Sequence, residues 1–303
     1  MNIKNVFILG AGYGTRMGSV GTILPKILWP VFEKTLLELQ VNYAKSLGAE
    51  RIFVNTHYQA QKIQEYITIN KIPVEVSYEK EILDVGGGIH QVAQKLNYSG
   101  ELLVLNGDQF LFLKAEELEE AQKKIQNKRI CLFSIELENL GYNEISIDSF
   151  GNLSHIQKGL GVKVKTYAGV SLINLQALTK KTGISNFFES VANYKQQEVK
   201  VIFTTSPYLD FGSTKRYVKS LFEILQMESS SSPYLFFLNN NALREDKINR
   251  ESRTYGATQV SDIVNLGLEM VKEKKAKEVV ILKDTHLPIL DSGVYYEGFF
   301  SPL

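Results

Sequence analysis

The chain of 303 residues is poor in the residue types that mark several protein classes. It has one cysteine, Cys131, so no disulfide can form within the chain, and this composition is typical of a reducing compartment. The apolar neighbours Ile130 and Leu132 predict a buried strand cysteine instead of a catalytic thiol. Histidines are also few, and none has the spacing of a metal site or a catalytic triad. We therefore expect structural roles for all four, which are His57, His90, His155 and His286.

An excess of charge of one sign is absent as well. The 34 basic and 33 acidic residues leave a net charge of +1, which gives no electrostatic basis for binding nucleic acid or an anionic membrane. The longest apolar runs have the length of a strand, well below the roughly 18–20 residues of a membrane span. Residues 1–9 carry one lysine and no long apolar core, so a secretory signal is not expected. We expect a cytoplasmic protein.

What the sequence does have is an alternation of short β-branched runs and segments with helical periodicity. The predicted strands cover 6–9, 51–55, 74–78 and 102–105, and the predicted helices between them cover 36–47, 59–67 and 89–96. This order predicts an α/β fold with a Rossmann-like, doubly wound sheet of mostly parallel strands. Ligands bind at the carboxyl ends of such strands. The glycine-rich stretch after the first strand and Asn106-Gly107-Asp108 after the fourth should therefore line the same edge.

The pattern changes after Asp108. Further strands are predicted over 144–148, 153–157, 167–173 and 199–204, followed by a helix over 214–225. The stretch MESSSSP, residues 227–233, predicts a linker between a catalytic domain over 1–226 and a C-terminal extension over 234–303. The extension is expected to be a small α/β unit, with a helix over 261–274 and a strand over 278–282. Its role stays open between packing over the site, mediating a homodimer and extending the core.

The stretch LGAGYGTRMGSVGTILPK, residues 9–26, places glycines, one arginine and one lysine close together. A dinucleotide fingerprint would need a glycine where Thr15 stands, and the Gly-Lys-Ser/Thr of a Walker loop is missing. Glycines let the backbone approach an anion, and the N–H groups of such a loop cradle phosphate oxygens. Arg16 adds a rigid fork for two oxygens, and Lys26 adds a compact charge for a third. The stretch therefore predicts a polyphosphate site.

The order Gly10-Ala11-Gly12-x-Gly14-Thr15-Arg16-Met17, followed by Pro25-Lys26, resembles the signature of the sugar-1-phosphate nucleotidyltransferases. The resemblance covers most of residues 1–225 and includes, in the family's order, VNTHYQAQKIQEYI (54–67), LDVGGGI (83–89), LNGD (105–108), YNEISIDSFG (142–151) and YLDFGSTKRY (208–217). It implies the family's fold and a nucleotidyltransferase that depends on Mg²⁺. The loop departs from the family's frequent Pro-Leu-Thr, because Ser19-Val20-Gly21 stands there.

The resemblance also implies roles for individual residues. Arg16 and Lys26 are the catalytic groups, with Arg16 on the departing β- and γ-phosphates and Lys26 on the α-phosphate. The nucleotide is held by Leu9, Gly10, Ala11, Gly12, Gly14, Thr15, Glu79, Gly86 and Gly87. Among these, Gly86 and Gly87 admit the base and Glu79 contributes to its choice. The sugar phosphate is held by Asn143, Lys158 and Gly169, and the Mg²⁺ ion by Asp108 and Asp210.

The implied reaction joins a sugar 1-phosphate to the nucleotidyl group of a nucleoside triphosphate and releases pyrophosphate. The nucleophile is a phosphate oxygen that is already ionised at neutral pH, so no general base is needed. The motifs GGGI and VNTHY are most similar to those of N-acetylmuramate-1-phosphate uridylyltransferases, which favours UTP. Mannose- and heptose-1-phosphate guanylyltransferases, which use GTP, are the alternative. A further alternative is a non-catalytic subunit that senses a nucleotide or sugar nucleotide, with the extension as its interaction surface.

Overall fold

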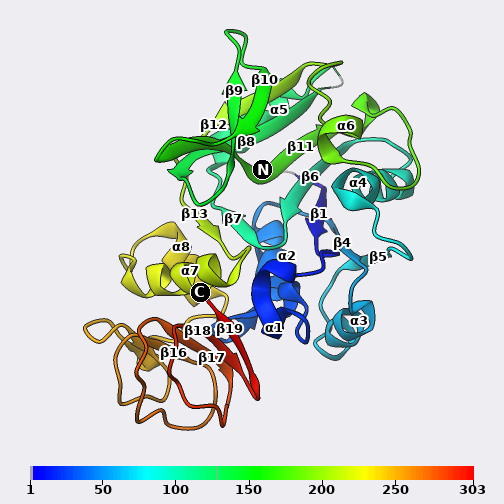
Figure 1. The fold of residues 1–303 in the computed structure, drawn as a ribbon. Helices are drawn as coiled ribbons and strands as arrows, with labels where there is room; N and C mark the ends of the chain where they lie inside the picture. The colour runs from blue at the N-terminus through cyan, green and yellow to red at the C-terminus, as the bar shows by residue number, and fades with distance from the viewer. Residues whose placement is uncertain (1–2, 128) are drawn as a thin grey trace.

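A computed structural model describes residues 3–127 and 129–303 (Figure 1). Its centre is a seven-stranded sheet in which one strand, β11, is antiparallel to both of its neighbours and the others pair in parallel. In spatial order the strands are β12 (Val199–Phe203), β8 (Ile130–Glu138), β11 (Lys163–Asn174), β6 (Glu101–Asn106), β1 (Asn5–Leu9), β4 (Arg51–Thr56) and β5 (Glu75–Tyr78). The predicted α/β fold with a mostly parallel sheet is confirmed.

The side chains of the central strands alternate between two apolar clusters, one on each face of the sheet. In β1, Val6 and Ile8 belong to the larger cluster, whereas Phe7 belongs to the smaller one. Because both faces are covered, these strands consist almost entirely of apolar residues. Helices α2 (Leu36–Ser46), α3 (Ala60–Ile69), α5 (Ala115–Lys124) and α7 (Thr214–Gln226) pack in the larger cluster, and α4 (Asp84–Lys95) and α6 (Phe187–Ser190) pack in the smaller.

Helix α2 begins where local side chains satisfy its first N–H groups. At α2, the Thr35 hydroxyl accepts the N–H of Glu38 at 3.3 Å, and the Glu38 carboxylate accepts the N–H of Thr35 at 3.0 Å. Helix α4 begins at Asp84, five residues before the predicted start at 89, so the three glycines 86–88 are helical. Periodicity missed this first turn because glycines carry no apolar side chain.

Short antiparallel ladders bring distant segments to the edge of the central sheet. Strand β7 (Gln109–Leu111) pairs with β13 (Tyr208–Asp210), which places Gln109 opposite Asp210. The other two ladders are the hairpin of β9 (Asn143–Ile147) with β10 (Leu153–Lys158) and the pair of β2 (Pro30–Val31) with β3 (Lys34–Thr35). The β7–β13 ladder joins the turn after β6 to the segment before α7.

The extension consists of helix α8 (Ser232–Asn239) followed by a six-stranded sheet. Its strands are β14 (Ile248–Asn249), β15 (Thr254–Tyr255), β16 (Ile263–Asn265), β17 (Val279–Lys283), β18 (Gly293–Tyr296) and β19 (Phe299–Pro302). Strands β15 to β18 pair in parallel with their neighbours in sequence, and loops connect them. Their apolar residues Tyr255, Val264, Val280 and Val294 belong to the same cluster as α2 and α7. The extension and the residues before it therefore share one core.

The helix predicted over 261–274 is wrong. Strand β16 occupies its first turn, and side chains bond the backbone that follows. The Asp284 carboxylate accepts the N–H of Leu268 at 3.1 Å and of Glu269 at 2.9 Å, and the Asn265 amide donates to the Glu269 carbonyl at 2.9 Å. Such bonds compete with the N–H···O=C bonds of a helix.

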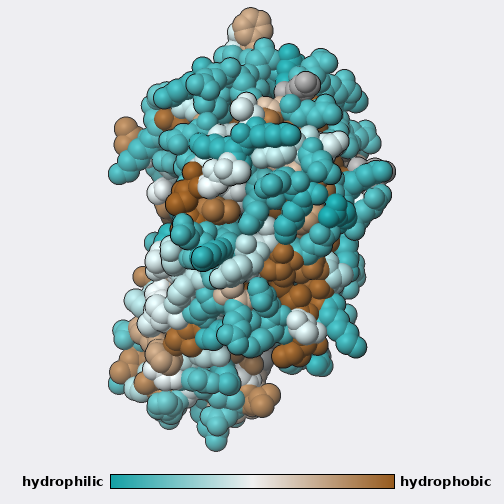
Figure 2. All heavy atoms as spheres, turned by 90° about the vertical axis from the view of Figure 1, so that its right-hand side faces the viewer, coloured by the Kyte–Doolittle hydropathy of each residue, from teal (hydrophilic) through white to brown (hydrophobic). Residues whose placement is uncertain are grey.

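Figure 2 shows the face that lies on the right in Figure 1. Hydrophobic residues gather there in separate patches among hydrophilic ones. Among the helices of the described residues, none is both long and apolar enough to cross a lipid bilayer.

His90 is a buried histidine of α4 that bonds two neighbours. Its Nδ1 lies 3.1 Å from the Tyr98 hydroxyl, and its Nε2 lies 3.2 Å from the Ser190 carbonyl oxygen. Burial lowers the pKa of the His90 imidazole below its ordinary value of 6.5. The native state therefore favours the neutral ring.

This shift predicts that acid weakens the fold through His90. In the unfolded chain the imidazole takes up a proton near pH 6.5, whereas in the native state it does so only at lower pH. Between these two values the unfolded state binds more protons, so the free energy of unfolding falls as the pH falls. Urea unfolding between pH 7 and pH 5 should show this loss, and His90→Gln should reduce it. The same substitution at exposed His155 is the control. An equal pH dependence in both variants would contradict the prediction.

Candidate active site

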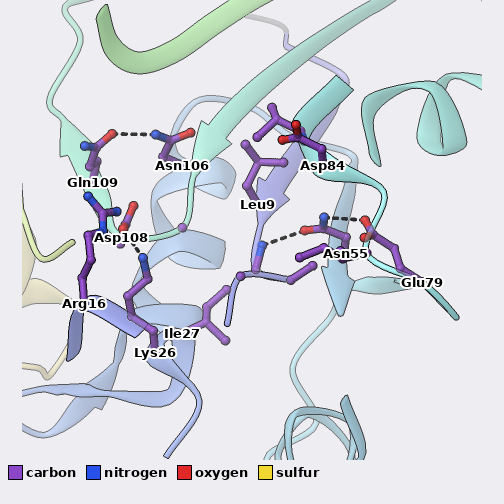
Figure 3. A pocket seen from close by; sticks show the side chains of 16 residues that line it. Leu9, Arg16, Lys26, Ile27, Asn55, Glu79, Asp84, Asn106, Asp108 and Gln109 are labelled. Carbon is purple, nitrogen blue, oxygen red and sulfur yellow. Dashed lines mark hydrogen bonds and ion pairs between the residues drawn. The ribbon is translucent and has the colours of Figure 1, made fainter. Parts of the chain in front are cut away.

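A cavity of about 270 Å³ lies at the carboxyl ends of β1, β4 and β6 (Figure 3). Eight predicted site residues line it, namely Leu9, Gly10, Ala11, Gly12, Arg16, Lys26, Glu79 and Asp108. The register of β1 and β6 places Leu9 beside Asn106, and the Gly107 N–H donates to the Leu9 carbonyl at 3.1 Å. The glycine-rich stretch and the Asn-Gly-Asp turn therefore meet at one edge of the sheet.

Different kinds of group lie at the two ends of this cavity. Figure 3 shows Arg16, Lys26 and Asp108 at one end, and Asn55 and Glu79 at the other. A ligand that fills the cavity would place an anionic part against the two cations. Its other part would meet an amide and a carboxylate that can donate and accept hydrogen bonds. This division suits a nucleotide, with its phosphates at the first end and its base at the second.

Arg16 is carried by a tight turn of the glycine-rich stretch. The 3₁₀-helix η1 (Thr15–Met17) follows Gly14, and the Met17 N–H donates to the Gly14 carbonyl at 2.9 Å. Gly14 and Thr15 shape this turn and do not line the cavity. Over residues 3–127 and 129–303, the Arg16 guanidinium forms no ion pair with a carboxylate. Its N–H donors are therefore available to phosphate oxygens.

Lys26 and Asp108 form a partly buried ion pair at the same end. Lys26 opens the 3₁₀-helix η2 (Lys26–Leu28), and its ammonium group donates a hydrogen bond to the Asp108 carboxylate. Burial acts to raise the pKa of Asp108, but the charges of Lys26 and Arg16 outweigh it and hold that pKa below its usual range. Asp108 is therefore a carboxylate at neutral pH.

Asp210 reaches the same place from β13. Its carboxylate accepts hydrogen bonds from the Tyr142 hydroxyl at 2.7 Å, the Arg216 guanidinium at 3.1 Å and the Gly212 N–H at 2.7 Å. A methyl group added at Gly212 would lie 2.8 Å from Asp210 Oδ1 and 3.0 Å from Asp108 Oδ2. The two carboxylates thus converge on the space that Gly212 leaves open.

This pair of carboxylates fits a hard divalent cation. Oxygen ligands are the ones that Mg²⁺ prefers, and it commonly binds through one or two carboxylates together with substrate phosphates. Among the described residues, no group of three or more His, Cys, Asp or Glu side chains forms a complete metal site. Asp108 and Asp210 would therefore hold such a cation only together with oxygens from a ligand.

Gly169 supports the floor of the cavity from the antiparallel strand β11. Its φ of +73° is a conformation that favours glycine. A methyl group there would overlap Gln109 Oε1 and lie 2.6 Å from Asn106 Nδ2. The absence of a side chain leaves room for the hydrogen bond of 2.7 Å between the Asn106 amide and Gln109 Oε1. Both of these amides line the cavity (Figure 3).

Residues 6–136 match the model of the MobA-like NTP transferase domain. The chain is 27% identical over 222 residues to D-glycero-alpha-D-manno-heptose 1-phosphate guanylyltransferase from Campylobacter jejuni, covering 69% of this chain and 95% of that protein. It is 32% identical over 155 residues to the bifunctional protein GlmU of Synechococcus sp. strain CC9311. That match covers 50% of this chain and spans only 33% of GlmU.

Solved structures share the fold of this NTP transferase domain. HddC from Yersinia pseudotuberculosis, solved in complex with GMP-PN, superposes with a TM-score of 0.63 over 73% of this chain and 99% of that chain, at 22% identity. A UDP-glucose pyrophosphorylase complexed with UDP-glucose superposes with a TM-score of 0.57 at 16% identity. Together with the sequence relatives, these matches confirm the predicted family and the enzyme class of sugar-1-phosphate nucleotidyltransferases.

The three residues predicted to hold the sugar phosphate, Asn143, Lys158 and Gly169, are not among those that line the cavity of the NTP transferase domain. Asn143 and Lys158 are exposed and stand opposite each other in the β9–β10 hairpin. The hairpin is connected to the site through Tyr142, which bonds Asp210 and lies under the Arg216 guanidinium at 4.2 Å from the ring centre. Their role in sugar binding stays a prediction.

Gly86 and Gly87 also lie outside the cavity lining. A methyl group at Gly86 would lie 2.6 Å from the carbonyl oxygens of Ser185 and Asn186, and one at Gly87 would lie 2.5 Å from that of Gly183. The glycines therefore let α4 pack closely against the segment that leads into α6. Their contact with a base stays a prediction, and the structure gives them this packing role.

Several polar residues of the NTP transferase site were not predicted from the sequence. The Asn55 carbonyl oxygen Oδ1 accepts the Gly10 N–H at 2.7 Å, and its Nδ2 donates to Glu79 Oε1 at 2.7 Å. Glu79 Oε2 in turn accepts the Leu83 N–H at 2.9 Å. Asn55 could have been predicted as a site residue, because it is a polar residue at the end of an otherwise apolar strand. Further missed residues are Asp84 and Gln109 at the cavity, and Tyr142 and Arg216 at Asp210.

Proposed function

We propose that this enzyme transfers a guanylyl group from GTP to a heptose 1-phosphate or the related mannose 1-phosphate. The heptose-1-phosphate guanylyltransferase of Campylobacter jejuni, which the chain covers over 95% of its length, supports this choice. The preference for UTP expected from the GGGI and VNTHY motifs is not confirmed, and the alternative with GTP is better supported. The products are the guanosine-diphosphate sugar and pyrophosphate.

The observation that carries the choice of guanine is the carboxylate of Glu79 at the base end of the cavity. Guanine presents two adjacent donors, the N1–H and the 2-amino group, and a carboxylate can accept both. Uracil presents a single N–H between two carbonyl oxygens, which a carboxylate repels. Asn55 and the Leu83 N–H each occupy one lone pair of Glu79 and hold it in place. Both oxygens keep acceptor capacity for a base.

The reaction requires two anions to approach each other. An oxygen of the sugar phosphate attacks the α-phosphorus of GTP, the new O–Pα bond forms, and the bond between the α-phosphorus and the bridging oxygen breaks as pyrophosphate leaves. Arg16, free of carboxylate partners within the described residues, holds the departing phosphates. Lys26 neutralises charge on the α-phosphate. A Mg²⁺ ion on Asp108 and Asp210 would supply further positive charge where the phosphates meet.

We expect GTP to protect the protein against heat more than UTP, CTP, ATP or dTTP does. A ligand at about 100 times its dissociation constant stabilises the folded state by roughly 2.7 kcal/mol, which raises the midpoint of unfolding by a few degrees. Glu79→Gln should reduce the shift with GTP, because an amide offers one acceptor and one donor to the two donors of guanine. Glu81→Gln, the same change on an exposed side chain two residues away, is the control.

A larger shift with UTP would contradict the proposal. Release of pyrophosphate from GTP with either sugar 1-phosphate then separates an enzyme from a subunit that only senses nucleotides.

A further inference from the structure

The C-terminal strand β19 contacts the loop that carries Arg16. The loop continues from η1 into the short helix α1 (Gly18–Gly21), and the buried N–H of Val20 donates to Ser301 Oγ at 2.9 Å. The Ser19 hydroxyl donates to the Phe300 carbonyl oxygen. Ser301 is fully buried. Figure 1 shows β19 beside α1. A segment 281 residues away in sequence therefore completes the hydrogen bonding of α1.

Gly18 shows how closely the two segments meet. It has a φ of +64°, and a methyl group there would lie 2.6 Å from Ser301 Oγ and 2.9 Å from Ser301 Cβ. Ser19 is the first of the three residues at which the loop departs from the family's frequent Pro-Leu-Thr. A proline at residue 19 would lack the hydroxyl that bonds β19. This loop is therefore built to receive the C-terminal strand.

The loop is held from two sides, by β19 and by residues at the start of α3. On one side, β19 pairs with β18 so that Ser301 stands opposite Val294, a residue of the main core. On the other side, the Gln59 amide donates to the Thr22 carbonyl at 2.7 Å, and the Lys62 ammonium donates to the Ile23 carbonyl at 2.7 Å. The loop is clamped between α3 and the extension.

The position of Arg16 depends on this clamp. Its side chain forms no ion pair among the described residues, so the backbone of the loop orients it. Met17, the next residue, is fully buried, and Gly21 packs against it so closely that a methyl group at residue 21 would lie 2.6 Å from Met17 Cβ. A shift of α1 is therefore passed through Met17 to Arg16.

We propose that Ser301 is a positioning residue for nucleotidyl transfer, because it holds the loop in the conformation that presents Arg16 to the triphosphate. This inference rests on the proposed function in that a nucleoside triphosphate is the ligand of the loop. It gives the extension a part in forming the nucleotide site.

Ser301→Ala removes the acceptor of the Val20 N–H. We expect the KM for GTP to rise roughly tenfold, which corresponds to about 1.4 kcal/mol, while the KM for the sugar 1-phosphate and kcat change less than threefold. A role in stability alone would lower the active fraction and hence kcat, and would leave both KM values unchanged. Ser301→Cys keeps the shape of the side chain but replaces the oxygen by a larger sulfur that is a weak acceptor, so it should resemble Ser301→Ala. Ser292→Ala, in the turn before β18, is the control.

Hydrogen exchange of the Val20 amide in the protein without substrate gives an independent measurement. Exchange should be faster in Ser301→Ala than in the wild type or Ser292→Ala. Unchanged KM values and unchanged exchange, or a fall in kcat alone, would overturn the proposal. If the wild type does not use GTP, the proposed function fails, and the same variants are measured with whichever triphosphate stabilises the wild type most. An equal thermal shift by that triphosphate in all variants would then overturn the role of Ser301.

Discussion

Asp108→Asn is expected to lower the rate of nucleotidyl transfer by roughly 10²–10³-fold. The amide has nearly the same shape as the carboxylate but no charge, so it weakens the bond from Lys26 and removes one of the two carboxylates that face the space at Gly212. Asp210 alone would then bind a divalent cation weakly, because charge and ligand number set the affinity. The rate is measured as pyrophosphate release, and the binding of Mn²⁺ is measured by calorimetry.

Asp246→Asn is the matched control, since Asp246 is an exposed carboxylate that pairs with Arg244 in the extension. It should leave both the rate and cation binding unchanged. Circular dichroism of the Asp108 variant should show an intact fold. Turnover by Asp108→Asn within tenfold of the wild type would refute the assignment of Asp108 to the reacting phosphates.

Gly169→Ala is expected to lower the free energy of unfolding by roughly 3 kcal/mol. The alanine would have to keep a φ of +73°, which is unfavourable for a residue with a side chain. Its methyl group would also displace the hydrogen-bonded Asn106 and Gln109 side chains at the floor of the cavity. Moving these amides should also lower the rate of transfer in the fraction that folds. Urea unfolding gives the first quantity, and pyrophosphate release per folded molecule gives the second.

Gly100→Ala separates the effect of the positive φ from the effect of the collision with Asn106 and Gln109. Gly100 has a similar φ of +80°, but among the described residues none other than its chain neighbours lies within 4 Å of the added methyl group. This variant should lose only the backbone contribution, roughly 1 kcal/mol, and keep its full rate. Equal losses of stability in the two variants would show that the collision with Asn106 and Gln109 has no effect.

The sequence allowed the central sheet and the charged end of the site to be predicted. One apolar strand leads directly into the glycine-rich stretch and another into Asn106-Gly107-Asp108, and parallel pairing puts these strand ends together. This is why Arg16, Lys26 and Asp108 could be placed at one edge. Local chemistry is sufficient there because Arg16 and Asp108 follow their strands closely and Lys26 belongs to the same glycine-rich stretch as Arg16.

Other parts of the site depend on pairing that local sequence does not contain. The β7–β13 ladder brings Asp210 to Asp108, and only the family resemblance pointed to it. Gly86 and Gly87 were assigned to a base, although a close approach of two backbones requires glycine for the same steric reason. Residues 261–274 were predicted to be a helix, but β16 lies there and Asn265 and Asp284 bond the backbone that follows it.

The contact between Val20 and Ser301 also has a consequence for the order of synthesis. The loop with Arg16 leaves the ribosome 281 residues before its partner in β19, and contacts of such sequence separation form late in folding. A growing chain carries Arg16, Lys26 and Asp108 long before the acceptor for the Val20 N–H exists. With Ser301 in its proposed role, the chain gains full affinity for a triphosphate only after β19 has been translated. Incomplete chains would then not sequester the nucleotide that finished enzymes use.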